Sequence, residues 1–213
     1  MISQQVVSLY RSSGFGYRLY ALLRLKLCPL IALEKHIPRE GAILDCGCGV
    51  GLLSAILSLL SPGRMVQAFD SDASKIAVAR TIEKQLSNVT FTVSSLDTAC
   101  FSAYTTVIMC DMLYLIDFSQ QECILRRCFD QLPHGALLVI MDTDTRPRWK
   151  YFINNIHEAI MVKLLRFTRA SSFQVRSAPD FIALLKNIGF AVTLGRMDHG
   201  YIYAHIAYVC KKY

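Results

Sequence analysis

Ile-Leu-Asp-Cys-Gly-Cys-Gly-Val-Gly, residues 43–51, places a glycine-rich turn between an apolar run of strand length and an apolar helical pattern. The glycines stand at alternate positions, Gly47, Gly49 and Gly51. In an open α/β sheet, a glycine-rich first turn lets the backbone approach a ligand at the carboxyl ends of the strands. A pyrophosphate site has the pattern Gly-x-Gly-x-x-Gly, but Leu52 stands where its third glycine would pack the helix against the strand. Asp45 would also repel a phosphate, so we expect a ligand that carries positive charge.

The rest of the chain alternates apolar runs of strand length with helical patterns, which is typical of βαβ units on a parallel sheet. The expected strands are 42–45, 65–70, 89–93, 105–110, 137–142, 191–195 and 201–210. The expected helices are 52–60, 73–86, 120–132, 152–167 and 179–188. The last two strands are separated only by a short turn-rich stretch, which predicts an antiparallel hairpin. The pattern therefore predicts an α/β fold with a seven-stranded, mostly parallel sheet, a C-terminal antiparallel hairpin and helices on both faces.

The chain has 213 residues, which is enough for one sizeable hydrophobic core and short for two, so we expect a single domain, 1–213. The composition is 53% hydrophobic, which prompts a search for membrane spans. The two most apolar stretches, 46–63 and 19–33, contain or are bracketed by glycines, charged residues or a proline, and neither predicts a span. The first residues also lack the pattern of a signal peptide, so we expect a cytoplasmic protein.

The eight cysteines show no Cys-x-x-Cys pair and no nearby histidine pair at zinc spacing. A chain of this size does not need disulfides to build its core. We therefore expect reduced thiols that behave as small core residues, and no metal site.

A second acidic position follows at the end of the next expected strand. The stretch Phe69-Asp70-Ser71-Asp72 comes roughly 20 residues after the glycine turn, where a carboxylate accepts hydrogen bonds from ribose hydroxyls. A ribose and a cation together describe S-adenosylmethionine, which carries an ammonium and a sulfonium and no phosphate. The pattern Asp-x-Gly-x-Gly-x-Gly with Asp70 downstream resembles the class I S-adenosylmethionine-dependent methyltransferases, as do residues 107–111 and 132–138. The resemblance implies a Rossmann-like fold and S-adenosylmethionine as the cofactor.

The resemblance also implies which residues bind the cofactor. They are Asp45, Gly47, Cys48, Gly49, Gly51 and Cys110 at the methionine part, Asp70 at the ribose, and Ser71, Asp72, Ser95 and Leu96 near the adenine. The family often has an acid where this chain has Ser95, so either Ser95 bonds the adenine amine or Asp97 replaces the acid. Cys110 would contribute its carbonyl, because methyl transfer needs no thiol nucleophile.

The acceptor side is expected at the ends of the fourth and last strands. Methyl transfer depends mainly on positioning, and a base is needed only if the acceptor is protonated. In the family, the end of the fourth strand faces the acceptor, which implies Asp111 and Tyr114 as catalytic residues; a helix cap is the alternative for Asp111. The period of two in the last expected strand puts Tyr201, Tyr203 and His205 on one face. We expect the two tyrosines to line the acceptor pocket, and His205 to be either a catalytic base or a hydrogen-bonded core histidine.

The net charge of +7 is concentrated in two basic blocks. They comprise Arg11, Arg18, Arg24, Lys26, Lys35 and Arg39, and then Arg146, Arg148, Lys150, Lys163, Arg166, Arg169 and Arg176. In the family, segments outside the sheet cover the acceptor, which implies an N-terminal helical lid in residues 1–40 and a lid insertion in residues 146–178. The basic side chains are either solvated outer faces of these helices or a site for an anionic partner, such as a membrane surface or an acidic carrier protein.

We therefore expect an enzyme that transfers a methyl group to a small or lipid-like acceptor at oxygen, in the cytoplasm or peripheral to the inner membrane. Residues 147–151 and 200–205 also resemble, more weakly, bacterial methyltransferases associated with lipid-like or aryl polyene biosynthesis. A cofactor-binding module without turnover is an alternative, favoured only by the missing acid at Ser95. An RNA methyltransferase is a third interpretation. The chain shows no RNA-binding appendage and no Asn/Asp-Pro-Pro-Tyr pattern after the fourth strand, so nucleic acid is the less favoured partner.

Overall fold

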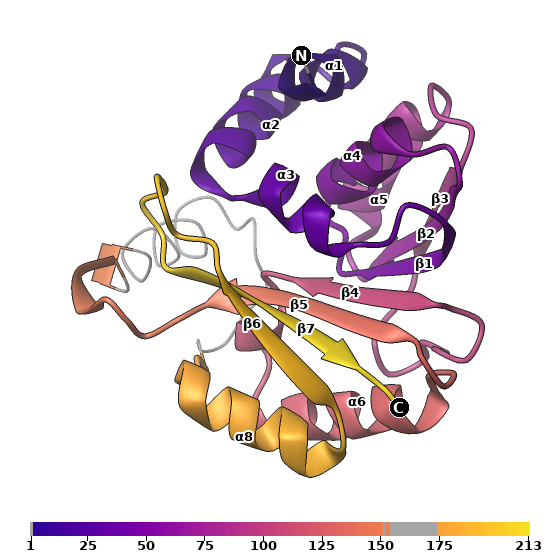
Figure 1. The fold of residues 1–213 in the computed structure, drawn as a ribbon. Coiled ribbons are helices and arrows are strands. Elements are labelled where there is room, and N and C mark those ends of the chain that lie inside the picture. The colour runs from indigo at the N-terminus through magenta and orange to yellow at the C-terminus, as the bar shows by residue number, and fades with distance from the viewer. Residues whose placement is uncertain (1, 151, 154–173) are drawn as a thin grey trace.

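The computed structural model describes residues 2–150, 152–153 and 174–213, which form a seven-stranded sheet in the order β3-β2-β1-β4-β5-β7-β6 (Figure 1). The strands are β1 (Gly41–Cys46), β2 (Arg64–Asp70), β3 (Val89–Val93), β4 (Thr106–Cys110), β5 (Leu137–Thr143), β6 (Ala191–Arg196) and β7 (His205–Lys211). β1 to β5 pair in parallel, whereas β7 is antiparallel to both β5 and β6. The predicted α/β fold with its C-terminal antiparallel hairpin is confirmed.

Helices cover both faces of this sheet, as predicted (Figure 1). They are α1 (Ile2–Leu9), α2 (Phe15–Leu27), α3 (Leu30–Leu33), α4 (Leu52–Leu60), α5 (Ala73–Glu83), α6 (Phe118–Gln131) and α8 (Ala178–Ile188), with 3-10 turns η1 (Glu34–His36) and η2 (Leu113–Leu115). Successive strand residues enter opposite layers: Ile43 packs in the cluster that includes α1 to α5, and Leu44 packs in the cluster that includes α6 and α8.

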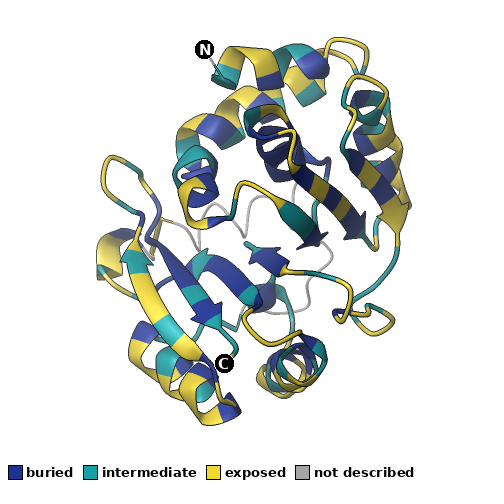
Figure 2. Cartoon of the chain, turned by 45° about the vertical axis from the view of Figure 1, so that its right-hand side comes forward, coloured by how far each residue is buried: buried dark blue, intermediate teal, exposed yellow. Residues whose placement is uncertain are grey.

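The burial of the strands follows their place in the sheet. The central strands β4 and β5 are nearly continuous apolar runs because helices cover both of their faces. The edge strand β6 is largely exposed, as Figure 2 shows. The carboxyl ends of β1, β2, β3 and β4 meet at one edge of the sheet, and that edge carries the candidate site.

Two buried side chains fasten the N-terminal helices to the rest of the fold. Tyr10 directly follows α1, and its hydroxyl donates a 2.9 Å hydrogen bond to the carbonyl of Val50 in the glycine turn. The fully buried guanidinium of Arg64, at the start of β2, lies 2.7 Å from the carboxylate of Glu34 in η1. Arg64 also donates to the carbonyls of Ile37, Pro38 and Leu57. An arginine is tolerated at this depth because its donors are satisfied.

One predicted boundary is wrong, and one predicted segment lies outside the described residues. β7 begins at His205 and not at Tyr201, because Gly200 has a left-handed backbone and the amide of Tyr201 donates to the carbonyl of Asp198 in a turn. Most of the predicted lid insertion, 146–178, and of its helix, 152–167, falls outside the described part of the chain. Within that part, none of the helices combines the length and the apolar character required to cross a bilayer.

Candidate active site

A cavity of about 660 Å³ opens at the carboxyl ends of the parallel strands, where open α/β sheets bind their ligands. The turns after β1, β2 and β3 form one wall. The opposite wall is apolar and comes from α2, through Leu19, Leu23 and Leu27. Of the residues that we predicted at the site, all but Gly51, Tyr201 and His205 line this cavity.

Two glycines of the turn, Gly49 and Gly51, have different roles that the sequence pattern does not distinguish. Gly49 lines the cavity with φ +57, and no atom lies within 4 Å of the position that a Cβ would take, so the turn leaves open space for a ligand. Gly51 has φ +84, and a Cβ there would lie 2.6 Å from the ring of Phe91. This corrects the expectation for Gly51: its missing side chain makes room for Phe91 of β3, not for the cofactor.

Asp70, at the end of β2, is held in place by the backbone. The amide of Gly49 donates to Asp70 Oδ2, and the amide of Asp72 donates to Oδ1, both at 2.9 Å. A carboxylate oxygen has two lone pairs, so each oxygen still has room for a second donor. The geometry therefore fits the predicted role, in which two ribose hydroxyls donate to Asp70 beside Ser71.

Asp45, at the end of β1, is a buried carboxyl at the floor of the cavity. Burial raises the pKa of Asp45 to about 7, although a hydrogen bond from Ser54 in α4 acts in the opposite direction. A bound cation would restore the charged form and be held by it. Asp45 is thus suited to an ammonium ligand. Ser54 was not predicted from the sequence, although a polar residue in the apolar first turn of a helix could have indicated it.

The loop after β3 forms the far end of the cavity, where the adenine is expected. Ser95, Leu96 and Asp97 all line the cavity, so the choice between Ser95 and Asp97 as the adenine partner stays open. Arg127 of α6 fixes this loop by donating to the carbonyls of Leu96 and Asp97, and it lies over the ring of Phe101. Sequence reasoning missed Arg127, because its partners are about 30 residues away in the chain.

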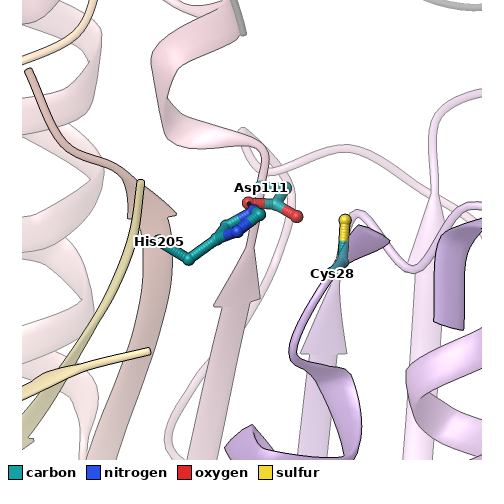
Figure 3. A group of neighbouring side chains, drawn as sticks. All are labelled: Cys28, Asp111 and His205. Atoms are coloured by element: carbon teal, nitrogen blue, oxygen red, sulfur yellow. Dashed lines mark ion pairs between the residues drawn. The ribbon is translucent and has the colours of Figure 1, made fainter. Parts of the chain in front are cut away.

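Asp111, directly after β4, is the centre of a buried charge network. Its backbone is left-handed, with φ 51, and among the described residues no other non-glycine residue has a positive φ. Its side chain forms an ion pair with Arg24 of α2, and its Oδ1 lies 3.3 Å from Nε2 of His205 (Figure 3). Such backbone strain costs about 1–3 kcal/mol and is typical of functional sites. The helix cap that was the alternative role for Asp111 is supplied to α6 by Asp117.

The charges in this network are mutually stabilised. Burial raises the pKa of Asp111, but the positive charges of His205 and Arg24 outweigh it and hold this pKa below its usual value. Burial lowers the pKa of His205, but the Asp111 carboxylate outweighs it and raises this pKa to about 10. At neutral pH the pair is therefore a carboxylate and an imidazolium. His205 already holds its proton, which makes it a positioning residue for Asp111 and disfavours its predicted role as a base.

Cys28, which follows α2, completes a cluster with the residue types of a metal site. Its sulfur, an imidazole nitrogen of His205 and a carboxylate oxygen of Asp111 all lie within 4.8 Å of one another, and Figure 3 shows the three side chains facing a common point. Arg24 and the protonated His205 already place two positive charges beside Asp111, and these charges would repel a metal ion. We therefore interpret the cluster as a charge network.

Of the remaining predicted acceptor residues, some line the cavity and one does not. Tyr114 of η2 and Tyr203 line the cavity, but Tyr201 does not, because the turn before β7 breaks the expected alternation. Cys110 lines the cavity as well, and burial raises the pKa of its thiol well above the usual value, which agrees with a role for its backbone alone. The apolar residues of α2 were not predicted as site residues, although their periodicity was visible.

The sequence of residues 17–194 matches a family described as a methyltransferase domain. No curated protein matches the chain. Among solved structures, the fold is similar to an O-methyltransferase family protein from Burkholderia thailandensis, with a TM-score of 0.65 and 14% identity, over 90% of this chain and 56% of that one. It is also similar to magnesium protoporphyrin IX methyltransferase from Synechocystis with bound S-adenosylmethionine, with a TM-score of 0.62 and 17% identity, over 86% and 76% of the two chains.

Human N-acetylserotonin methyltransferase in complex with S-adenosylmethionine has a TM-score of 0.67 and 16% identity, and the match covers 97% of this chain and 58% of that one. The present chain thus spans little more than half the length of some structures that it resembles. At these identities the likeness establishes the fold. The weaker resemblance to enzymes of lipid-like or aryl polyene biosynthesis stays a prediction.

Proposed function

Because this chain belongs to the methyltransferase domain family, we propose that it transfers the methyl group of S-adenosylmethionine to a hydroxyl oxygen of a small, apolar acceptor. The cofactor supplies an electrophilic methyl carbon on a sulfonium when it is bound. The observation that carries the choice of acceptor is Asp111, an ionised carboxylate at the junction between the polar and the apolar walls of the cavity.

The polar wall fits the cofactor. Asp45 is a buried carboxyl suited to an ammonium, Asp70 has free acceptor positions for two hydroxyls, and Gly49 leaves open space above the turn. The same wall does not fit a dinucleotide, because Asp45 opposes a pyrophosphate. In this proposal these residues bind and orient the cofactor and take no part in the transfer itself.

The apolar wall supports an apolar acceptor. Leu19, Leu23 and Leu27 of α2 face this part of the cavity, and Tyr203 and Tyr114 add aromatic surface. The cavity extends from the glycine turn to this apolar wall, and its volume of about 660 Å³ lies within the range of about 300–1,000 Å³ that is typical of ligand pockets. An acceptor of that kind binds through burial of apolar surface, and a polar contact must set its orientation.

Asp111 is suited to provide that polar contact. Asp111 lines the cavity, and its Oδ1 lies 3.3 Å from Nε2 of His205. A carboxylate oxygen has two lone pairs, so Oδ1 can accept a hydrogen bond from a substrate hydroxyl as well. Arg24 and His205 keep the carboxylate ionised, so that it orients the hydroxyl and accepts its proton as the new carbon–oxygen bond forms.

The test uses S-adenosylmethionine with a deuterated methyl group and a small-molecule extract, and mass spectrometry locates the label. We expect the label in a methoxy group. Asp111→Asn should lower turnover by roughly 10²–10⁴-fold with cofactor affinity unchanged, because in this proposal Asp111 contacts the acceptor and not the cofactor. Asp130→Asn, an exposed residue of α6, is the matched control and should retain full turnover. A label on nitrogen, sulfur or carbon, or normal turnover in Asp111→Asn, would contradict the proposal.

A further inference from the structure

Helix α2 exposes apolar side chains to solvent. Phe15 is 78% exposed and Leu23 is 48% exposed, and Leu19 and Leu22 are exposed beside them. Their spacing of three and four residues places them on neighbouring rows of one helix face. The opposite face packs into the core through Ala21 and Leu25. The helix is therefore anchored on one side and carries an apolar stripe, defined here as Phe15, Leu19, Leu22 and Leu23, on the other.

The surroundings of this stripe are strongly cationic. The first 33 residues contain no Asp or Glu, and Arg18 and Lys26 of α2 and Arg11 just before it are exposed. Arg24 is the basic residue of α2 that turns inward, to Asp111. An apolar stripe with basic flanks on one short helix is the pattern of helices that lie in the interface of an anionic membrane.

The stripe continues directly into the cavity. Leu19 and Leu23 are both exposed at the surface and part of the cavity wall. Tyr203, which also lines the cavity, follows a turn whose Asp198 forms an ion pair with Lys150. An apolar molecule would thus pass from the stripe into the cavity without crossing water.

We propose that the stripe of α2 docks this protein on the surface of an anionic lipid bilayer, with the cavity mouth facing the lipid. Two other occupants fit less well. A second copy of the chain would bring the same basic flanks together across a two-fold interface, where they repel. An acidic carrier protein would satisfy the basic flanks, but it would need a matching apolar surface to cover the stripe as well. A bilayer with anionic headgroups satisfies both the charge and the apolar surface.

The docking does not depend on the proposed acceptor, so the experiment uses the full chain without cofactor or acceptor. Binding is measured by co-sedimentation with vesicles of phosphatidylcholine, with and without about one third phosphatidylglycerol. The test variant is Phe15→Glu/Leu22→Glu, since both residues are exposed and neither lines the cavity. The matched control is Met65→Glu/Leu194→Glu, which makes the same change in charge and polarity at two exposed residues of β2 and β6.

We expect the parent and the control variant to sediment with the anionic vesicles, and the α2 variant to bind roughly tenfold more weakly or worse. Binding of the parent should fall steeply between about 0.1 M and about 1 M salt, because the Debye length shortens from about 10 Å to about 3 Å. Circular dichroism and the urea unfolding midpoint, compared with those of the parent, show whether the α2 variant is folded.

The proposal is overturned if the parent fails to sediment with anionic vesicles or if the α2 and control variants lose binding equally. It is also overturned if the parent is a dimer in light scattering that the α2 variant abolishes, since a second copy would then cover the stripe.

Discussion

The two glycines Gly49 and Gly51 should respond oppositely to the same substitution by alanine. Both have left-handed backbones, which cost an alanine roughly 1–2 kcal/mol. At Gly51 the new methyl would also lie 2.6 Å from Phe91, and overpacking of this kind costs about 1–3 kcal/mol. Gly51→Ala should therefore lower the free energy of unfolding by about 2–5 kcal/mol, and Gly49→Ala by only about 1–2 kcal/mol.

Cofactor affinity should show the reverse order. The methyl of Gly49→Ala would occupy space in the cavity that is now open, and one misplaced methyl in a pocket costs about 10–200-fold in affinity. Gly51→Ala, measured well below its unfolding midpoint, should bind S-adenosylmethionine almost as the parent does. Urea denaturation and titration calorimetry give the two quantities. Phe91→Leu should partly restore the stability of Gly51→Ala. Parent-like stability of Gly51→Ala, or parent-like affinity of Gly49→Ala, would refute the division of roles.

Three further outcomes are expected. Asp70→Asn should remain folded, because the backbone positions it, and should lose about 1.5–3 kcal/mol of cofactor binding by calorimetry. Asp45 has a pKa of about 7 in the folded, cofactor-free protein, against about 3.9 when unfolded, so the folded state holds the extra proton. The free energy of unfolding should therefore decrease as pH rises from about 4 to about 7, and Asp45→Asn should remove that slope in urea titrations. Arg64→Met should cost about 3–5 kcal/mol by leaving the buried carboxylate of Glu34 without this partner, and Arg64→Met/Glu34→Leu should cost less than the single change.

The sheet could be predicted because each parallel strand is a short apolar run bounded by a turn. Asp45, Gly49 and Asp70 could be placed at the cavity for the same reason, since each closes a strand or follows one directly. The start of β7 was misplaced because alternating aromatic residues, Tyr201 and Tyr203, imitate a strand in a segment that forms a turn.

The acceptor side was harder to foresee because its contacts join distant parts of the chain. The ion pair of Arg24 with Asp111 spans 87 residues, and no local pattern marks either residue as the partner of the other. Gly51 was misassigned for a related reason. The sequence pattern predicts the strand that contains Phe91, but it does not show that the ring of Phe91 lies against Gly51. Helical periodicity in α2 was evident, but an apolar stripe alone does not show that part of it faces a cavity.

The hydrogen bond from Tyr10 to Val50 joins the segment before α2 to the glycine turn, where we propose that the cofactor binds. Both groups are buried, so a movement of the turn that separated them would leave two polar groups without partners, at a cost of about 1–3 kcal/mol each. The turn and the helix are therefore mechanically linked. When the cofactor fixes the turn, it also fixes the wall against which the acceptor binds, and thermodynamic reciprocity requires the acceptor to strengthen cofactor binding by the same factor. The enzyme should then bind its two substrates with positive cooperativity, each tightening the other by the same factor.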